Sequence, residues 1–199
     1  MTKNFQEAMA HRRSYYVLED KSPISDNEIV EIVKQAVKHV PSAFNSQSTR
    51  VVVLLHDKHK KVWDITKEIL KDMMPAEAFE NTKEKIETSF QNGYGTLLFY
   101  EDQAPVKALQ EQFPLYKQNF PVWSEHTNAM HQFAIWTMLE DAGFGVSVQH
   151  YNPIIDEKVA ETFNIPADWK LIAQMPFGIP GAEPGEKEYQ PLENRVLVP

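Results

Sequence analysis

The sequence predicts a layered α/β sandwich. Helix-like and strand-like segments alternate along the 199 residues, and long helical stretches separate the strand-like ones. This order favours helices packed on a sheet over a bundle made only of helices. Hydrophobic residues make up 42% of the chain and aromatic residues 11%, which suffices for a packed core at this length. We therefore expect residues 1–199 to form a single domain.

Two helices are expected before residue 41. Residues 3–12 suit a short helix with an apolar face, which would consist of Phe5, Ala8 and Met9. The second helix follows Ser25, which forms an S-x-x-E capping box with Glu28. Apolar residues then recur at helical spacing until Pro41 ends the pattern.

Three apolar runs predict the core strands of the sheet. They are RVVVLL at residues 50–55, TLLFY at 96–100 and WKLIAQMPFG at 169–178. A further strand is expected in FGVSVQHY, residues 144–151, and the last residues of the chain, RVLVP, are strand-like as well.

Helical spacing of apolar residues predicts the segments between these strands. Helices are expected within residues 57–71, 75–92 and 156–163. The longest should run from Ser124, as N-cap, to about Ala142, with Gly143 as its C-terminal stop. The Pro-rich stretch 102–123 should be irregular or consist of short helices.

Composition excludes several kinds of protein. The formal net charge is −8, so a nucleic-acid binder with a broad basic face is not expected. The chain has no cysteine, which excludes disulfides, thiolate nucleophiles and cysteine-held metal centres. The nearby histidine pairs lack a third ligand, so no metal site is expected. Without a secretory signal or an apolar run of about 20 residues, we expect a cytoplasmic protein that does not enter a membrane.

Two segments in the first quarter of the chain could bind a ligand. Arg12-Arg13-Ser14 could hold a phosphate by charge-assisted hydrogen bonds, or could be a solvated basic patch. The loop PSAFNSQSTR, residues 41–50, carries many short polar side chains between a helix and a strand. It could read the edge of a heterocycle, or be an ordinary turn.

Two later segments are weaker candidates. Gln149 and His150 leave the end of an expected strand, where α/β folds often place ligands, although a lone histidine is more often structural. Lys187 and Arg195 lie in the acidic, Pro-rich tail, and each on its own could be a surface charge.

In this order and spacing, the segments resemble the FMN-dependent nitroreductase family. RRSYY is similar to the first flavin-binding segment of that family, and PSAFNSQS to its P-S-S/A-x-N-x-Q-P-W segment. YGTLLFYEDQ, FPLYKQNFPVWSE, VSVQHYNPIID and PGEKEYQPLENRV resemble its fatty-acid-repression-mutant-type subgroup. The resemblance covers essentially the whole chain.

The resemblance implies an α+β fold, a three-layer α/β/α sandwich that forms an intertwined homodimer. One FMN per subunit would lie at the interface, and the tail, residues 179–199, would pack on the partner subunit. The phosphate and ribityl chain would meet Arg12, Arg13 and Ser14. The flavin ring would be lined by Ser42, Ala43, Asn45 and Gln47, with the Ser42 end reaching the partner's cofactor.

The resemblance assigns roles to three more residues. Gln149 and His150 lie where the family presents a backbone N–H to flavin N5, and Lys187 where a tail cation meets the phosphate. The chain departs from the family pattern at Ser48-Thr49, which stands where Pro-Trp is usual. Basic residues common in the family are replaced by Tyr16 and Tyr189.

The function implied is that of an NAD(P)H-dependent oxidoreductase acting on nitroaromatic or quinone-like acceptors. Hydride transfer at flavin N5, in a ping-pong cycle, would need no catalytic side chain. The aromatic residues that either wall the acceptor pocket or simply pack are Phe113, Tyr116, Phe120 and Trp123. A flavin-binding sensor with little turnover and a dimer that binds a small molecule without flavin remain as alternatives.

Overall fold

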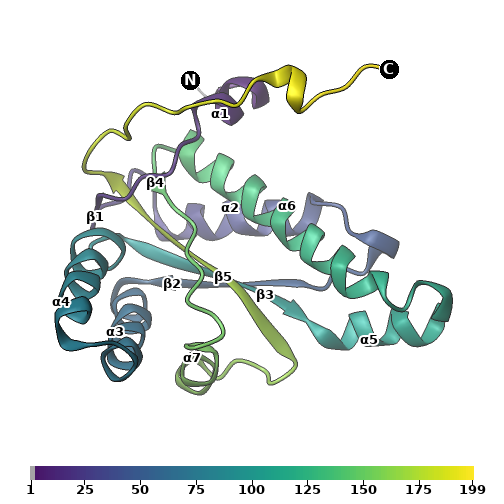
Figure 1. The fold of residues 1–199 in the computed structure, drawn as a ribbon, viewed down its shortest axis with the longest axis horizontal. Coiled ribbons are helices and arrows are strands. Elements are labelled where there is room, and N and C mark those ends of the chain that lie inside the picture. The colour runs from purple at the N-terminus through teal and green to yellow at the C-terminus, as the bar shows by residue number, and fades with distance from the viewer. Residues whose placement is uncertain (1–2) are drawn as a thin grey trace.

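A five-stranded antiparallel sheet lies at the centre of the computed structural model, which describes residues 3–199 (Figure 1). The strand order is β1-β5-β3-β2, and β4 also pairs with β5. The strands are β1 (Leu18–Glu19), β2 (Thr49–Leu55), β3 (Gly95–Asp102), β4 (Gly145–Val146) and β5 (Trp169–Pro180). The core strands predicted at residues 50–55, 96–100 and 169–178 are thereby confirmed.

Helices cover both faces of this sheet (Figure 1). The α-helices are α1 (Phe5–His11), α2 (Asp26–His39), α3 (His56–Met73), α4 (Ala76–Lys85), α5 (Gln103–Gln112), α6 (Asn119–Asp141) and α7 (Asp156–Phe163). Shorter helical segments are η1 (Ala43–Asn45), η2 (Ile86–Phe90), η3 (Pro114–Tyr116) and η4 (Leu192–Asn194). None of the helices within residues 3–199 is long and apolar enough to cross a bilayer.

Two apolar cores hold the layers together. On one face, Ile29 of α2 and Ile135 of α6 pack on Phe99 and Phe177 of the sheet. On the other face, side chains of α3, η2 and α7 pack on Leu98 and on neighbouring strand residues. The structure is therefore the expected three-layer α/β/α sandwich, with β3 and β5 buried between the two helical layers.

The predicted capping box at the start of α2 is present. The Ser25 hydroxyl accepts from Glu28 N at 3.4 Å, and the Glu28 carboxylate accepts from Ser25 N at 2.8 Å. These bonds satisfy two of the N–H groups that have no partner inside the helix.

The expected start of the longest helix was wrong. Helix α6 begins at Asn119, and Ser124 lies buried inside it, where its hydroxyl donates to Pro121 O at 2.8 Å. Pro121 does not stop the helix because it sits in the first turn, where backbone N–H groups lack intrahelical acceptors. Gly143 does follow the end of the helix, with φ at 99°.

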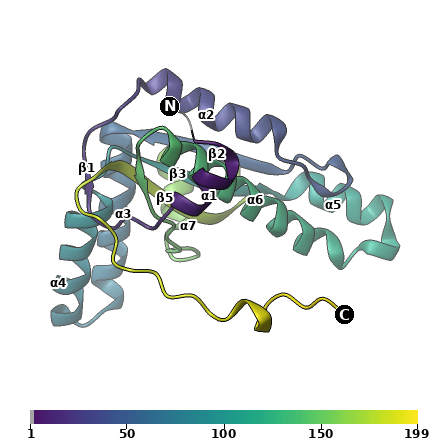
Figure 2. The ribbon, with the colours of Figure 1, turned by 90° about the horizontal axis from the view of Figure 1, so that it is seen from above.

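Two expected strands are shorter or absent. Within residues 144–151 only Gly145–Val146 form a strand, followed by one isolated bridge between Gln149 and Gln174. RVLVP is not a strand, because no edge among residues 3–199 pairs with it. Figure 2 shows the tail running away from the sheet, and Val196, Leu197 and Val198 are 64%, 82% and 91% exposed.

The expected apolar face of α1 is only partly buried. Ala8 is buried, whereas Phe5 is 71% exposed and Met9 is exposed as well. Because α1 packs on α6 with a narrow contact, the larger side chains on either side of Ala8 face outward. One chain by itself therefore leaves apolar surface uncovered at this end of the molecule.

His59 of α3 is buried, and its burial favours the neutral form. Its Nε2 lies 3.1 Å from Gln91 O, which can only accept, so this nitrogen carries the proton. Trp63 Nε1 donates to Thr96 Oγ1 at 2.9 Å, and in the neutral ring the Thr96 hydroxyl donates to His59 Nδ1, which lies 2.8 Å away. Burial lowers the pKa of His59 to about 4.

We expect His59 to make the protein less stable as the pH falls from about 6.5 to about 4. In this window the unfolded state binds a proton at His59 that the folded state does not bind. The resulting loss in the free energy of unfolding is on the order of 3 kcal/mol. Urea unfolding across this pH range checks it, with His59→Gln as the control. Equal pH dependence in both proteins would contradict the assignment.

Candidate functional site

The fold brings the Arg12–Ser14 segment and the tail together around one cavity. This cavity of about 360 Å³ is lined by Arg12, Arg13, Ser14, Tyr16 and residues 184–187. The Arg13 guanidinium donates to Gly185 O at 2.6 Å, which ties the two segments to each other. Three cationic side chains line the cavity, and Glu186 is the only acid among the described residues that do so. In a chain of net charge −8, this local excess of positive charge favours an anion.

Arg12 is held at the centre of this region. Its guanidinium lies 4.3 Å from the centre of the Trp136 ring, a stacking contact that fixes its direction. Burial and the neighbouring Arg13 lower the pKa of Arg12, although Glu140 acts in the opposite direction. Its Nε is buried and has no hydrogen-bond acceptor within residues 3–199. A buried donor of this kind needs an acceptor, such as a ligand oxygen.

A second cavity continues the site along α6. It has a volume of about 400 Å³, and Arg12 and Ser14 line both cavities. Its remaining walls are Ala129, Gln132, Phe133, Trp136 and Val148. The combined space has a cationic end and a largely apolar end, which suits a molecule with an anionic group and a flat ring.

Gln149 and His150 differ in what their main chains can still bind. Gln149 N donates to Gln174 O at 2.7 Å, and Gln174 N donates back to Gln149 O at 2.9 Å. The N–H of Gln149 is therefore already used in the sheet. His150 is exposed, and its N–H has no acceptor among residues 3–199. Only His150 of this pair has a main-chain donor free for a ligand.

The loop with Ser42, Ala43, Asn45 and Gln47 lies away from the Arg12 cavity. It contacts the opposite end of α6, beside α5, whereas α1 lies near the C-terminal end of that helix (Figures 1 and 2). Phe44, Asn45 and Gln47 all have left-handed backbones, with φ between 46° and 54°. Ser42 Oγ accepts from Gln47 N at 3.0 Å and so closes the loop.

An aromatic cluster surrounds this loop. The Phe44 ring centre lies 5.0 Å from that of Phe113 and 5.2 Å from that of Phe120, and it is stacked on Trp123 at 6.0 Å. Phe44 and Trp123 also line a cavity of about 380 Å³, together with Ala43, His126, Thr127 and Met130. Of the four aromatic residues predicted either to wall a pocket or to pack, Phe113, Tyr116 and Phe120 pack in the cluster, and Trp123 both packs and lines this cavity. Phe44 is the member that sequence reasoning missed.

Other residues of the site also escaped the sequence analysis. Trp136, Gln132 and Phe133 lie within a long helix, where aromatic and apolar residues at helical spacing indicate a core. Nothing local distinguishes Trp136 from a core residue. No cluster of three His, Asp or Glu side chains suited to a metal ion occurs within the part of the chain that the structure describes.

Comparisons with known proteins agree in one family. The sequence pattern of the Nitroreductase family matches residues 9–179. The nitroreductase FRM2 of Saccharomyces cerevisiae is 33% identical over 190 residues, which cover 94% of each chain. The structure of nitroreductase CinD from Lactococcus lactis, in complex with nicotinic acid, matches with a TM-score of 0.91 and 42% identity, over 98% of this chain and 100% of that one.

CinD has also been solved with chloramphenicol and with 4-nitrophenol. A nitroreductase-fold protein from Desulfovibrio desulfuricans in complex with FMN matches with a TM-score of 0.71, and its 16% identity shows a shared fold. The match covers all of this chain and 98% of the Desulfovibrio desulfuricans chain. The family match, the identity to FRM2 and the fold lead to one conclusion: this chain belongs to the nitroreductase family.

Proposed function

We propose that this chain is an FMN-dependent oxidoreductase that uses NAD(P)H to reduce nitroaromatic or quinone-like acceptors. The observation that carries the proposal is the double cavity around Arg12, with its cationic end and its aromatic end. FMN has a phosphate at one end and a flat ring at the other. The FMN complex of the same fold from Desulfovibrio desulfuricans supports this choice of ligand.

The cationic end would hold the phosphate. Arg12, Arg13 and Lys187 can donate charge-assisted hydrogen bonds to phosphate oxygens, and Arg12 Nε would gain the acceptor it lacks. The Ser14 hydroxyl lines both cavities and suits the ribityl chain between them. The free N–H of His150 would donate to the ring edge, while the Gln149 main chain holds the strand end in place.

FMN would supply the redox chemistry when bound. The protein contributes binding, orientation and positive charge. NAD(P)H and the acceptor would occupy the site in turn, which is a ping-pong order. The small aromatic ligands of CinD support planar acceptors, and the cavity beside Phe44 and Trp123 is apolar enough to take one.

The working unit we propose is a homodimer. In one chain the loop 42–47 lies far from the Arg12 cavity, so a second chain would bring Ser42, Ala43, Asn45 and Gln47 to it. Three exposed apolar side chains lie on one face of α6, spaced as helical neighbours: Val122, Met130 and Phe133. The tail, residues 179–199, would pack on the partner, which would cover its exposed apolar end.

The visible spectrum of the purified protein tests the cofactor, and oxidation of NADH and NADPH with a nitroaromatic tests the activity. Bound FMN with turnover is the expected result. Bound FMN without turnover would favour a flavin-binding sensor. A colourless protein that takes up no FMN on titration would refute the proposal and favour a ligand-binding dimer without flavin.

We expect His150→Gln to keep most of the rate at which NAD(P)H reduces the bound flavin. The variant changes the side chain but keeps the N–H that we assign to the ring. His150→Pro deletes that N–H and should slow the same step. Stopped-flow measurement of the two half-reactions separates the roles. A loss of about 100-fold confined to acceptor reduction in His150→Gln would instead identify the imidazole as a proton donor.

A further inference from the structure

The loop proposed to reach the partner's flavin has an unusual backbone. Phe44, Asn45 and Gln47 have φ values of 54°, 52° and 46°, in the left-handed region that non-glycine residues rarely adopt. Such conformations persist when the surrounding structure holds them in place. The contacts within the loop are few, namely Asn45 N to Ser42 O, Ser46 N to Ala43 O, and Gln47 N to Ser42 Oγ. Other parts of the fold must therefore hold the loop.

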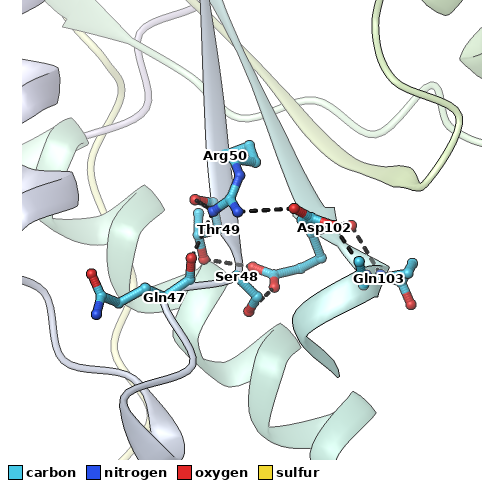
Figure 3. Close-up of polar contacts among 8 residues, drawn as sticks. Gln47, Ser48, Thr49, Arg50, Asp102 and Gln103 are labelled. Atoms are coloured by element: carbon cyan, nitrogen blue, oxygen red, sulfur yellow. Dashed lines mark hydrogen bonds and ion pairs between the residues drawn. The ribbon is translucent and has the colours of Figure 1, made fainter. Parts of the chain in front are cut away.

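The end of β3 holds the loop where β2 begins. Glu101 is 1% exposed, and its carboxylate accepts from Ser48 Oγ at 2.6 Å and from Thr49 Oγ1 at 2.5 Å. The main chain adds a bond from Asp102 N to Ser48 O at 3.0 Å. Figure 3 shows Gln47, Ser48 and Thr49 beside this end of β3. The two residues directly after the loop are thus fixed from two sides.

Arg50 forms a second set of hydrogen bonds that link the loop to β3, nearer the surface. Arg50 donates through Nη1 to Gln47 O at 2.6 Å and through Nη2 to Asp102 Oδ2 at 2.9 Å (Figure 3). Arg50 is only half-buried, so water competes with these bonds. The buried carboxylate of Glu101 is therefore the stronger restraint of the two.

Glu101 also connects the loop to α6. Asn128 Nδ2 donates to Glu101 Oε1 at 3.0 Å, and Gln132 Nε2 donates to Asn128 Oδ1 at 2.8 Å. Gln132 in turn lines the cavity that holds Arg12 and Ser14. One chain of hydrogen bonds thus runs from the loop to the other group of site residues.

Stability alone does not explain this carboxylate. No lysine, arginine or histidine within residues 3–199 forms an ion pair with Glu101, and burying a carboxylate without a cation is costly even when hydrogen bonds satisfy its oxygens. An apolar side chain of similar size would avoid that cost but could not accept three hydrogen bonds. The carboxylate instead fixes the orientation of its neighbours, because the Ser48 and Thr49 hydroxyls and the Asn128 amide all donate to it.

We propose that Glu101 is the positioning residue of the flavin loop. Its carboxylate holds Ser48 and Thr49, which stand where the family pattern has Pro-Trp, and so sets the turn that presents Asn45 and Gln47. The inference rests on the proposed flavin site. Glu101 does not touch the cofactor in this account and acts only through the loop.

Hydrogen exchange and FMN titration of three variants test the proposal. Glu101→Leu should speed amide exchange at residues 45–47 by about tenfold or more and raise the FMN dissociation constant by a similar factor. Glu101→Gln keeps an acceptor for Asn128 and Thr49, so it should stay within about threefold of the parent protein in both measurements. Ser48→Ala, which removes one bond, should lie between them and covers the case in which Glu101→Leu does not fold.

Thr96→Val is the matched control. Thr96 lies on the same strand as Glu101 and is equally buried. The substitution removes its hydrogen bonds to His59 and Trp63, which lie far from the loop. It should lower the unfolding temperature without a selective effect on the amides of residues 45–47. The proposal is overturned if Ser48→Ala and Glu101→Leu leave those amides unchanged, if exchange rises equally across β3 and β5, or if FMN affinity is unaffected. If the parent protein binds no FMN, amide hydrogen exchange of the flavin-free protein still tests whether Glu101 holds the loop through Ser48 and Thr49.

Discussion

Ending the chain at Gly185 is expected to weaken dimerisation and flavin retention together. The cut removes Lys187, which lines the cationic cavity, and the apolar end Val196–Val198, which is largely exposed in one chain. Burying three such side chains on a partner would contribute about 4–6 kcal/mol per chain. Sedimentation velocity and the absorbance of bound flavin, compared with the full-length protein, measure the two effects.

A shorter cut separates the two contributions of the tail. Ending the chain after Asn194 keeps Lys187 but removes the apolar end, so it should harm the dimer more than the flavin contact. Lys187 Nζ lies 5.1 Å from the centre of the Tyr189 ring, and this contact remains after the shorter cut. A tight dimer with a full complement of FMN after the longer cut would make the tail a surface appendage and remove Lys187 from the site.

Arg12→Ala is expected to lower FMN affinity by roughly ten- to a hundredfold. A charge-assisted pair with the phosphate contributes on the order of 1.5–3 kcal/mol, and the stacking on Trp136 holds the guanidinium ready for it. Titration of the flavin-free protein with FMN measures the loss. The fold should remain intact, because Arg12 lies after the last turn of α1 and not in either core.

Riboflavin and a remote charge change are the controls for Arg12→Ala. Riboflavin lacks the phosphate, so its affinity should change much less than that of FMN. Lys34→Ala removes one positive charge from the exposed side of α2 and should change neither affinity. Equal losses for FMN and riboflavin would show that Arg12 does not bind the phosphate.

Elements with local signals could be predicted from the sequence. The capping box of Ser25 and Glu28 and the apolar runs of β2, β3 and β5 each depend on neighbouring residues in the chain. Elements that need a distant partner could not be predicted. Residues 144–151 pair with β5 only briefly, and RVLVP has no edge to join among residues 3–199. The same local composition therefore gives a strand in one place and an extended segment in another.

The site was predictable in part for the same reason. The family resemblance identifies Arg12, Arg13 and Lys187 as candidate ligands in two separate segments of the chain. It does not show that the segments meet, because the hydrogen bond from Arg13 to Gly185 joins residues 172 positions apart and leaves no local signal in the sequence. Trp136 resembles an ordinary core residue of a long helix, and Glu101 an ordinary charge at a strand end. Their contacts with Arg12 and with Ser48 exist only once α6 and β3 are in place.

Helix α6 sets the distance and the relative orientation of the two groups of candidate site residues, those around the loop 42–47 and those around Arg12. Thr127 lines the cavity beside the loop and Trp136 lies beneath Arg12, about 14 Å apart along the axis at about 1.5 Å per residue. One residue added or removed between them would turn one group by about 100° relative to the other. A length change in the turn between α3 and α4, on the other face of the sheet, would leave this spacing and orientation unchanged.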